Sequence, residues 1–453
     1  MKITFPRPPP EVSKAMQERQ LDPRLPLLQQ AKLKDKVVLV RLDHNVVKKG
    51  KIRDPYRIDR TIGTLFYIVA QGGRPILMTH VGRPYDKKTG AINVDQGGSV
   101  QPIVDYLRSK LHCDFLVPSF PVADGKGIQA IDTSINLAIK QLKNGEVAGI
   151  YLPNTRWFAG EEQRGDIRQS FALQLAGLAD IYVNDAFGSW QPHASTFDVT
   201  QHLPAYAGFL MQAEIGNLDQ VLKPTRPFVA VVAGSKYDTK IGPLSAIYAQ
   251  VDHLILGGVI YNTYLCAKYG VKIAGVTAED IAAAQDLVRL DQAANKVVEL
   301  PLLVESQVLG REEGKYRTVS VADLKPGQEL GYVLDIDPRS FESPRVREVI
   351  GQAKTIFVNA VMGFTPHFTD GSKALDTAID QNRQAAKLYG GGDTLQEFKD
   401  LLPGLYLSVL DDADYYFFTG GGTVLTAIEQ GTPYGLPTVQ ALMDNAQRFQ
   451  TLA

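Results

Sequence analysis

The chain has 453 residues, of which 44% are hydrophobic and 21% are charged. This length suits two or three domains that each bury a core without disulfides. The two cysteines, Cys113 and Cys266, are as few as a reducing, cytoplasmic compartment predicts. With 48 Lys and Arg against 49 Asp and Glu, the formal net charge is −1, so no overall field favours binding to nucleic acid or to a membrane. No apolar run reaches the length of a membrane span, and because residues 1–30 contain prolines and mixed charges in place of an apolar core, we expect no signal peptide. We expect small-molecule partners.

Short apolar, β-branched runs alternate with helix-like stretches along the chain. They cover residues 37–42, 75–79, 149–152, 181–184, 227–233, 254–256, 354–359 and 415–418. This alternation predicts an α/β fold with parallel sheets covered by helices. Such sheets bind ligands beyond the carboxyl ends of their strands, so the residues after each run are candidates for chemistry.

The predicted strand ends of the first half carry cationic, amide and carboxylate side chains. They are Arg41, Asp43, Asn45, His80, Arg83, Asn154, Arg156, Asn184, Asp185 and His193. Alternation places the first three on one face, where they suit hydroxyls and carboxylates, although an ordinary polar strand terminus is the alternative. The segment Thr79-His80-Val81-Gly82-Arg83-Pro84 predicts a rigid loop that presents two cationic donors. Arg57 is either a ligand of the same site or a solvated helix charge.

A helix is predicted between the two halves. Residues 208–222 have helical apolar spacing and end before Pro224 and Pro227. We expect this segment to connect two domains.

The strand ends of the second half carry glycine and lysine. Gly234, Lys236 and Lys240 follow the run 227–233, Gly257 and Gly258 follow the run 254–256, and Asn359 ends the run 354–359. The two lysines lie one helical turn apart and suit a phosphate chain, whereas a solvated lysine face is the alternative. The glycine spacing is not that of a Walker loop.

Two glycine turns follow in the last quarter. They are Gly390-Gly391-Gly392-Asp393-Thr394 and Thr419-Gly420-Gly421-Gly422-Thr423, and each precedes a predicted helix. Glycines let the backbone approach an anion while the helix points N–H groups at it. Asp393 adds a hard oxygen ligand for Mg²⁺. Tight turns without a ligand are the alternative, but two such turns favour phosphate binding.

The candidate residues of the first half include no nucleophile or catalytic dyad. Asp43 is a conceivable base, but a carboxylate acceptor needs no deprotonation. Catalysis would then consist of positioning and charge neutralisation.

These motifs, in this order, resemble the phosphoglycerate kinase family over residues 37–440. Arg41-Leu42-Asp43-His44-Asn45 corresponds to the family's Arg-Val-Asp-Phe-Asn, and residues 79–84 correspond to Ser-His-Leu-Gly-Arg-Pro. Residues 182–188 match almost residue for residue. Lys236, Lys240 and both glycine turns fall on family motifs.

The resemblance implies two Rossmann-like domains that face a cleft and close about a hinge. It implies an N-terminal arm (1–30), an acid-substrate domain (31–207), an interdomain helix (208–225), a nucleotide domain (226–430) and a C-terminal segment (431–453) that returns to the first domain. It also implies Mg²⁺ and ATP or ADP as co-substrate, and we expect a monomer.

The resemblance also assigns roles to residues. The 3-phosphoglycerate site would contain Asp43, Asn45, Arg57, His80, Arg83, Arg156 and His193. The nucleotide site would contain Gly234, Lys236, Lys240, Gly257, Gly258, Asn359, Gly391, Gly392, Asp393 and Thr394, with Asp393 on the metal. Arg57, Lys236, Gly391 and Gly392 would stabilise the transferring phosphoryl group. The second turn, 419–422, would shape the cleft rather than bind a ligand.

The chain departs from the family pattern both where the acid substrate would bind and where the ribose of the nucleotide would bind. Trp190-Gln191-Pro192-His193 lacks a substrate arginine, which would cost about 1.5–3 kcal/mol of binding unless another cation replaces it. Pro366 stands where the family has the glutamate that binds the ribose. Ala233 and Val259 replace glycines, and Thr239 replaces an aspartate.

The leading hypothesis is therefore glycolytic phosphoglycerate kinase activity. The alternatives are a paralogue with another acid or phosphoryl donor, and a non-catalytic nucleotide-binding relative. Retention of Arg57, Lys236 and Asp393 disfavours the last of these.

Overall fold

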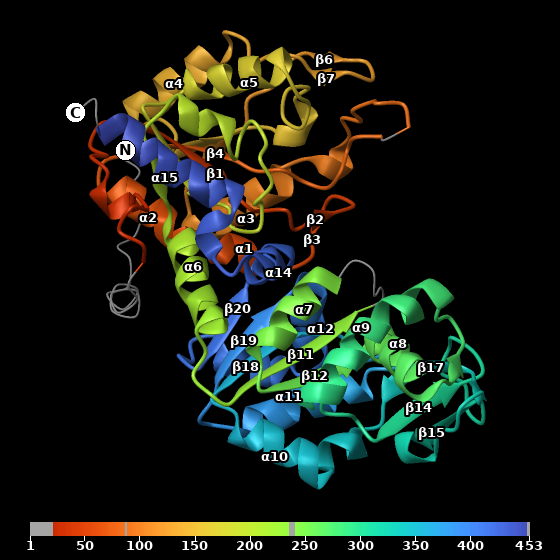
Figure 1. The fold of residues 1–453 in the computed structure, drawn as a ribbon. Coiled ribbons are helices and arrows are strands. Elements are labelled where there is room, and N and C mark those ends of the chain that lie inside the picture. Colours follow the sequence, from red (N-terminus) through yellow and green to blue (C-terminus); the bar gives the residue numbers. More distant parts are fainter. Residues whose placement is uncertain (1–20, 87, 235–240, 451–453) are drawn as a thin grey trace. The chain divides into compact units, whose positions relative to one another are not determined.

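A computed structural model describes residues 21–86, 88–234 and 241–450. The chain divides into two compact units (Figure 1). Unit 1 consists of Met1–Gly216 and Tyr434–Ala453, and unit 2 of Asn217–Pro433. Helix α6, Phe209–Leu222, runs across the boundary between them, where the sequence predicts a connecting helix. The predicted Lys236 and Lys240 lie outside the described residues.

Unit 1 is built on a parallel six-stranded sheet with the strand order β10-β9-β1-β4-β8-β5. Its strands are β1 Val37–Leu42, β4 Arg74–Met78, β5 Phe115–Leu116, β8 Gly149–Tyr151, β9 Ile181–Asp185 and β10 Ala205–Ala207. Two short antiparallel pairs are β2 Val47–Lys48 with β3 Lys51–Ile52, and β6 Val122–Ala123 with β7 Gly127–Ile128. The helices are α1 Tyr56–Asp59, α2 Ile62–Ala70, α3 Gln101–Leu111, α4 Ile135–Asn144, α5 Asp166–Ala176 and α15 Pro437–Gln450.

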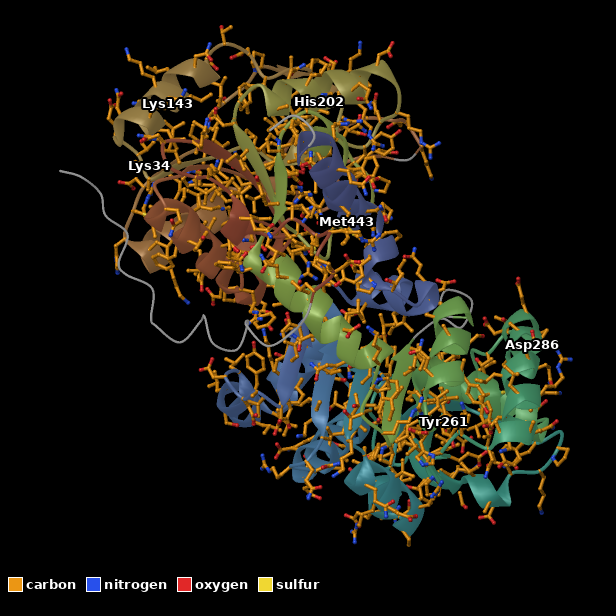
Figure 2. The ribbon with its side chains drawn as sticks, turned by 60° about the vertical axis from the view of Figure 1, so that its left-hand side comes forward. Lys34, Lys143, His202, Tyr261, Asp286 and Met443 are labelled. Carbon is orange, nitrogen blue, oxygen red and sulfur yellow. The ribbon has the colours of Figure 1, made fainter. Side chains whose placement is uncertain are left out.

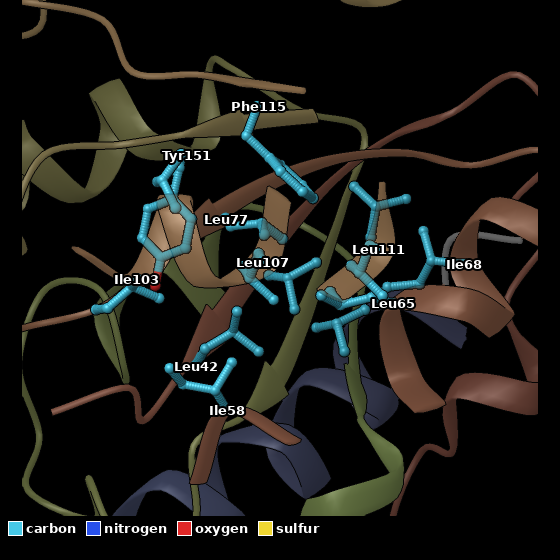
Figure 3. Packing of buried hydrophobic residues seen from close by; sticks show 14 of the residues in the cluster. Leu42, Ile58, Leu65, Ile68, Leu77, Ile103, Leu107, Leu111, Phe115 and Tyr151 are labelled. Carbon is cyan, nitrogen blue, oxygen red and sulfur yellow. The ribbon is translucent and has the colours of Figure 1, made fainter. Parts of the chain in front are cut away.

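The core of unit 1 lies between this sheet and helices α2 and α3. Ile103, Leu107 and Leu111 recur every four residues along α3 and meet Leu42 and Leu77 from the central strands (Figure 3). Burial of each such side chain contributes about 1.5–3 kcal/mol. The β-branched strands and the helical apolar stripe thus fix the ends of β1 and β4, which carry the candidate site.

Both ends of the described chain are anchored to unit 1. Leu25 and Leu28 are buried, and the Ala207 N–H donates to the Pro26 carbonyl at 2.8 Å. On α15, the Asn445 side chain accepts from the Ala205 N–H and donates to the Leu203 carbonyl, each at 2.8 Å. The last helix therefore packs beside the edge strand β10.

Unit 2 is built on a parallel five-stranded sheet with the order β12-β11-β18-β19-β20 (Figure 1). Its strands are β11 Phe228–Gly234, β12 His253–Gly257, β18 Thr355–Asn359, β19 Ala386–Gly390 and β20 Tyr415–Phe418. An antiparallel sheet joins β14 Leu302–Ser306 to β15 Tyr316–Ser320 and β17 Tyr332–Ile336, and β13 Lys272–Ile273 pairs with β16 Glu329–Leu330. The helices are α7 Ile241–Gln250, α8 Gly258–Tyr269, α9 Ala278–Ala294, α10 Pro344–Gln352, α11 Asp370–Gln381, α12 Gly392–Leu401, α13 Pro403–Val409 and α14 Gly421–Gln430.

Helix α8 lies inside unit 2. It contacts β11, β12, β17 and α9, and its residues 260–266 are all buried. Figure 2 shows Tyr261 of α8 within the unit, whereas Asp286 on α9 points outwards. A helix that is enclosed in this way is apolar around most of its circumference.

The predicted α/β fold class of two Rossmann-like domains is confirmed. All eight predicted strands form, with ends that differ from the prediction by one residue at most. The prediction omitted β5, β10 and β19 from the parallel sheets and the whole antiparallel sheet of unit 2. Within the described residues, no helix combines the length and apolarity needed to cross a bilayer.

Candidate active-site residues

The first candidate site lies at the carboxyl ends of β1 and β4 in unit 1. Asp43, one residue beyond β1, is 3% exposed, and its Oδ2 lies 3.2 Å from Nη1 of Arg57 on α1. The other carboxylate oxygen, Oδ1, is buried without a hydrogen-bond partner among the described residues. Because an unpaired buried oxygen is costly, Asp43 has the features of a side chain that accepts a donor from a ligand.

His80 lies two residues beyond the end of β4 and is held as a neutral donor. Arg41 Nη2 lies 3.1 Å from His80 Nδ1. A guanidinium can only donate, so Nδ1 accepts and the imidazole proton resides on Nε2. Burial, followed by the nearby charges of Arg41, Arg156, Arg57 and His193, lowers the pKa of His80 well below its usual value. His80 therefore offers an uncharged N–H to an anion.

Arg41 is fixed by a buried polar chain. Its Nε donates to Ser195 Oγ at 2.8 Å, and that hydroxyl donates to Glu161 Oε1 at 2.6 Å. A second hydrogen bond joins its Nη1 to the Leu42 carbonyl. These contacts fix the position of the Arg41 guanidinium. Among the described residues of this site, Arg41 is the one large cation that is almost fully buried, with 1% of its surface exposed.

The loop after β4 is tied to the loop after β8. Asn154 Oδ1 accepts from the Val81 N–H at 3.0 Å, and Asn45 Oδ1 accepts from the Gly82 N–H at 2.8 Å. Arg156 Nη1 donates to the Gly82 carbonyl at 2.6 Å. The loop that the sequence predicted to be rigid is thus held by amide side chains from two neighbouring strand ends.

Glu162 joins two further predicted ligands. Its Oε1 lies 2.6 Å from Arg156 Nε, where the angle does not suit a hydrogen bond, and 3.9 Å from His193 Nε2. Burial lowers the pKa of His193, although the carboxylates of Glu161 and Glu162 oppose this shift. Arg83 is exposed. Apart from Arg83, unit 1 brings the predicted residues together into a mainly cationic cluster that suits a small polyanion.

The second candidate site contains the first glycine turn, at the carboxyl end of β19 in unit 2. Gly391 has φ +126° and immediately precedes α12, and a Cβ there would lie 2.9 Å from Thr394 Oγ1. The Asn359 amide donates to the Gly390 carbonyl at 2.5 Å. The turn therefore requires glycine and directs the first N–H groups of α12 outwards as an anion site.

The second glycine turn supports the first. A Cβ on Gly421 would lie 2.5 Å from Gly391 Cα and 2.7 Å from Gly391 N. The two backbones can approach so closely only because Gly421 has no side chain.

A cavity of about 550 Å³ adjoins the first turn, a size that is ordinary for a small-molecule site. Seven predicted nucleotide ligands line it: Gly234, Gly258, Asn359, Gly391, Gly392, Asp393 and Thr394. Gly257 does not, because it lies against Met362, whose Sδ would be 2.5 Å from a Cβ at that position. Gly258 has φ +58° and bridges to Gly234.

Sequence reasoning missed the apolar wall of this cavity and two of its acids, Glu397 and Asp400. Val333 and Leu334 come from β17 of the unpredicted antiparallel sheet, and Phe364 is 42% exposed at the wall. Glu397, four residues after Asp393 on α12, lines the cavity and is 6% exposed. The helical spacing from Asp393 was the only available signal for Glu397.

Asp393 suits Mg²⁺ as a single carboxylate ligand that acts together with phosphate oxygens. Within the described part of the chain, no three His, Cys, Asp or Glu side chains gather as a metal site. Mg²⁺ at phosphate sites is commonly held by one or two carboxylates together with phosphate oxygens and water. An exposed Asp393 in the first turn of α12, next to the N–H groups that suit phosphate, fits that donor set.

The chain has two α/β units, each built on a parallel sheet. One unit contains a cationic cluster and the other contains a glycine turn beside an apolar cavity. Together these features define a phosphotransferase that acts on small molecules. A family model described as phosphoglycerate kinase matches residues 28–431. The chain belongs to the phosphoglycerate kinase family.

Individual relatives agree with this membership. The chain is 35% identical over 418 residues to a phosphoglycerate kinase of Roseiflexus sp., with 90% of this chain and 96% of the relative covered. It is also 35% identical over 411 residues to that of Chlamydia trachomatis, with 88% and 94% covered. The structure of phosphoglycerate kinase from Coxiella burnetii superposes with a TM-score of 0.70 at 27% identity, over 92% of this chain and 99% of the other. The enzyme from Pyrococcus horikoshii, with a TM-score of 0.72 and 21% identity over 94% and 100% of the two chains, supports the fold.

Proposed function

We propose that the protein is a phosphoglycerate kinase, which transfers a phosphoryl group reversibly between 1,3-bisphosphoglycerate and ADP to give 3-phosphoglycerate and ATP. The observation that carries the proposal is the pairing of a cationic strand-end cluster in one unit with a glycine phosphate turn in the other. The acceptor is a carboxylate, so the reaction requires no general base.

In the acid site, each residue has a distinct task. Arg57 and Arg156 neutralise the substrate phosphate and carboxylate as charge-assisted donors. His80 donates its Nε2–H without adding charge. Asp43 accepts from the substrate hydroxyl through its unpaired Oδ1, and Arg57 also neutralises the phosphoryl group in transit.

In the nucleotide site, the N–H groups of Gly391, Gly392 and Thr394 stabilise charge on the phosphate oxygens. Asp393 would hold Mg²⁺, which when bound neutralises charge on the phosphate chain. We assign Lys236 and Lys240, which lie outside the described residues, to the same phosphates. Val333, Leu334 and Phe364 provide an apolar surface for the base.

We further propose that closure about α6 brings donor and acceptor into line, in a cytoplasmic, monomeric enzyme. Two departures distinguish its ligand contacts from the family pattern. Gln191 and Pro192 supply no cation to the acid, and Pro366 supplies no acceptor to a sugar.

The test is ATP formation from 1,3-bisphosphoglycerate, ADP and Mg²⁺ by purified protein, with Arg57→Ala and Asp393→Ala as controls. We expect turnover that falls by at least about 10²-fold in each variant. Turnover no higher than in the variants would remove the proposal. A preference for another acid in a substrate panel would instead assign a paralogue.

A further inference from the structure

We propose that Glu397 binds the sugar hydroxyls of the nucleotide and is the residue that selects a ribonucleotide. This inference rests on the proposed nucleotide site and deepens it. It assigns a role to a carboxylate that the sequence analysis did not single out.

The lining of the cavity combines groups of different chemistry. The glycine turn, with its N–H groups and Asp393, suits phosphate. Another part is apolar and includes Val333, Leu334 and the exposed ring of Phe364, which suits a flat base. A nucleotide has a sugar between these two parts, and the sugar hydroxyls need an acceptor.

Glu397 has the right position for that acceptor. It lies one helical turn beyond Asp393 on α12, about 6 Å along the helix axis, and both residues line the cavity. In a nucleotide, the sugar lies at a comparable distance from the phosphates that bind the metal. Pro366, at the adjoining loop, has neither a side-chain donor nor an acceptor.

The contacts of Glu397 fix its carboxyl group and leave capacity for a ligand. Thr365 Oγ1 donates to Glu397 Oε1 at 2.9 Å, and the Ser372 hydroxyl is its second hydrogen-bond partner among the described residues. The Ser372 hydroxyl also accepts from the Met362 N–H at 3.0 Å. A carboxylate offers about four acceptor positions, so two partners leave room for vicinal hydroxyls.

Burial raises the pKa of Glu397, and the neighbouring Asp393 and Asp400 raise it further, while the two hydroxyls oppose the shift. Keeping a carboxylate in such surroundings is unfavourable. Hydroxyl donors from a bound sugar would reduce that cost, so the contact would also contribute favourably to the free energy of binding.

Asp400 provides a matched control. It lines the same cavity from the same helix, but it is exposed and its Oδ1 already accepts from Gln396 Nε2 at 2.9 Å. If any carboxylate at the cavity could bind the sugar hydroxyls, removal of the Asp400 side chain would have the same effect as removal of the Glu397 side chain.

The experiment measures the Kd of the full-length protein for Mg-ADP, Mg-2′-deoxy-ADP and Mg-3′-deoxy-ADP by calorimetry. We expect the wild type to prefer ADP by about tenfold or more over at least one deoxy form, as for a lost hydrogen bond to a charged group. In Glu397→Ala the preference should fall to about one because ADP binding weakens and deoxy-ADP binding changes little. Asp400→Ala should keep the wild-type preference.

Three results would overturn the inference. The first is an unchanged preference for ADP in Glu397→Ala, and the second is loss of that preference in Asp400→Ala instead. The third is an equal loss of affinity for all three nucleotides in Glu397→Ala together with a raised Mg²⁺ requirement, which would assign Glu397 to the metal. Glu397→Gln keeps the side-chain shape and, if Glu397→Ala does not fold, is tested in its place. Because binding is measured without turnover, a normal preference in a protein that fails to form ATP would refute the proposed function alone.

Discussion

Replacement of Gly421 by alanine tests whether the second glycine turn shapes the first. The added Cβ would lie 2.5 Å from Gly391 Cα, whereas carbon atoms in contact are about 3.5–4.0 Å apart. One of the two backbones must therefore move by about 1 Å. Gly421 is helical and does not require a positive φ, so the perturbation is purely steric.

The expected cost has two parts. Overpacking of this kind destabilises by about 1–3 kcal/mol, which lowers the Tm of a unit of this size by about 2–12 °C. A 1 Å displacement of groups that position a reactant can reduce catalysis by about 10²-fold. We expect kcat/KM for ADP to fall by that order while the affinity for 3-phosphoglycerate, whose proposed site lies in unit 1, is retained.

Gly422→Ala is the matched control. A Cβ at Gly422 meets no atom within 4 Å, and alanine stabilises a helix by about 0.5–1 kcal/mol relative to glycine. Urea unfolding and steady-state kinetics of both variants make the comparison. If Gly421→Ala binds and turns over ADP like Gly422→Ala, the close backbone contact does not shape the phosphate turn.

Three other predictions follow from buried groups. Arg57→Ala should lower kcat by about 10²–10³-fold and, because Asp43 loses its ion pair, lower the free energy of unfolding by about 1–3 kcal/mol; Arg57→Lys should recover part of the stability in urea titrations. Burial raises the pKa of Asp376 to about 8, so the folded state keeps a proton that the unfolded chain releases above about pH 4 and stability falls as pH rises. Asp376→Asn should therefore exceed the wild type in stability by more at pH 8 than at pH 5, and a constant difference would contradict this. Nitrogen NMR should find His80 neutral with its proton on Nε2 at pH 6, and Arg41→Met should raise its pKa because a cationic neighbour is lost.

The parallel sheets could be predicted because their strands carry their own local signal. Buried, β-branched runs such as 37–42 and 227–233 admit few other interpretations. The residues directly after them were predicted to form two groups, since parallel strands end at one edge of a sheet. The edge strands β5 and β10 are only two and three residues long, too short for any periodic pattern.

What the sequence could not provide are contacts between distant segments. Glu397 looks like one more solvated charge on an amphipathic helix, and only Thr365 and Ser372 from a separate loop and helix make it a buried acceptor. Likewise, Val333 and Leu334 join the cavity through the register of an antiparallel sheet. The tautomer of His80 depends on Arg41, 39 residues away.

The arginines of the proposed acid site are held by other groups of the protein, and this bears on its missing arginine. Arg57 is already oriented by Asp43, Arg156 by the Gly82 carbonyl and Glu162, and Arg41 by Ser195. Cations held in this way lose little conformational entropy on binding, a loss that otherwise costs about 0.5–1.5 kcal/mol for each side chain. For two pre-oriented arginines, the saving is about 1–3 kcal/mol, comparable with the cost of one absent charge-assisted contact. We therefore expect the proposed acid site to bind an acid that carries a carboxylate and a phosphate without a cation at Gln191 or Pro192, provided that this anion displaces Glu162 from Arg156.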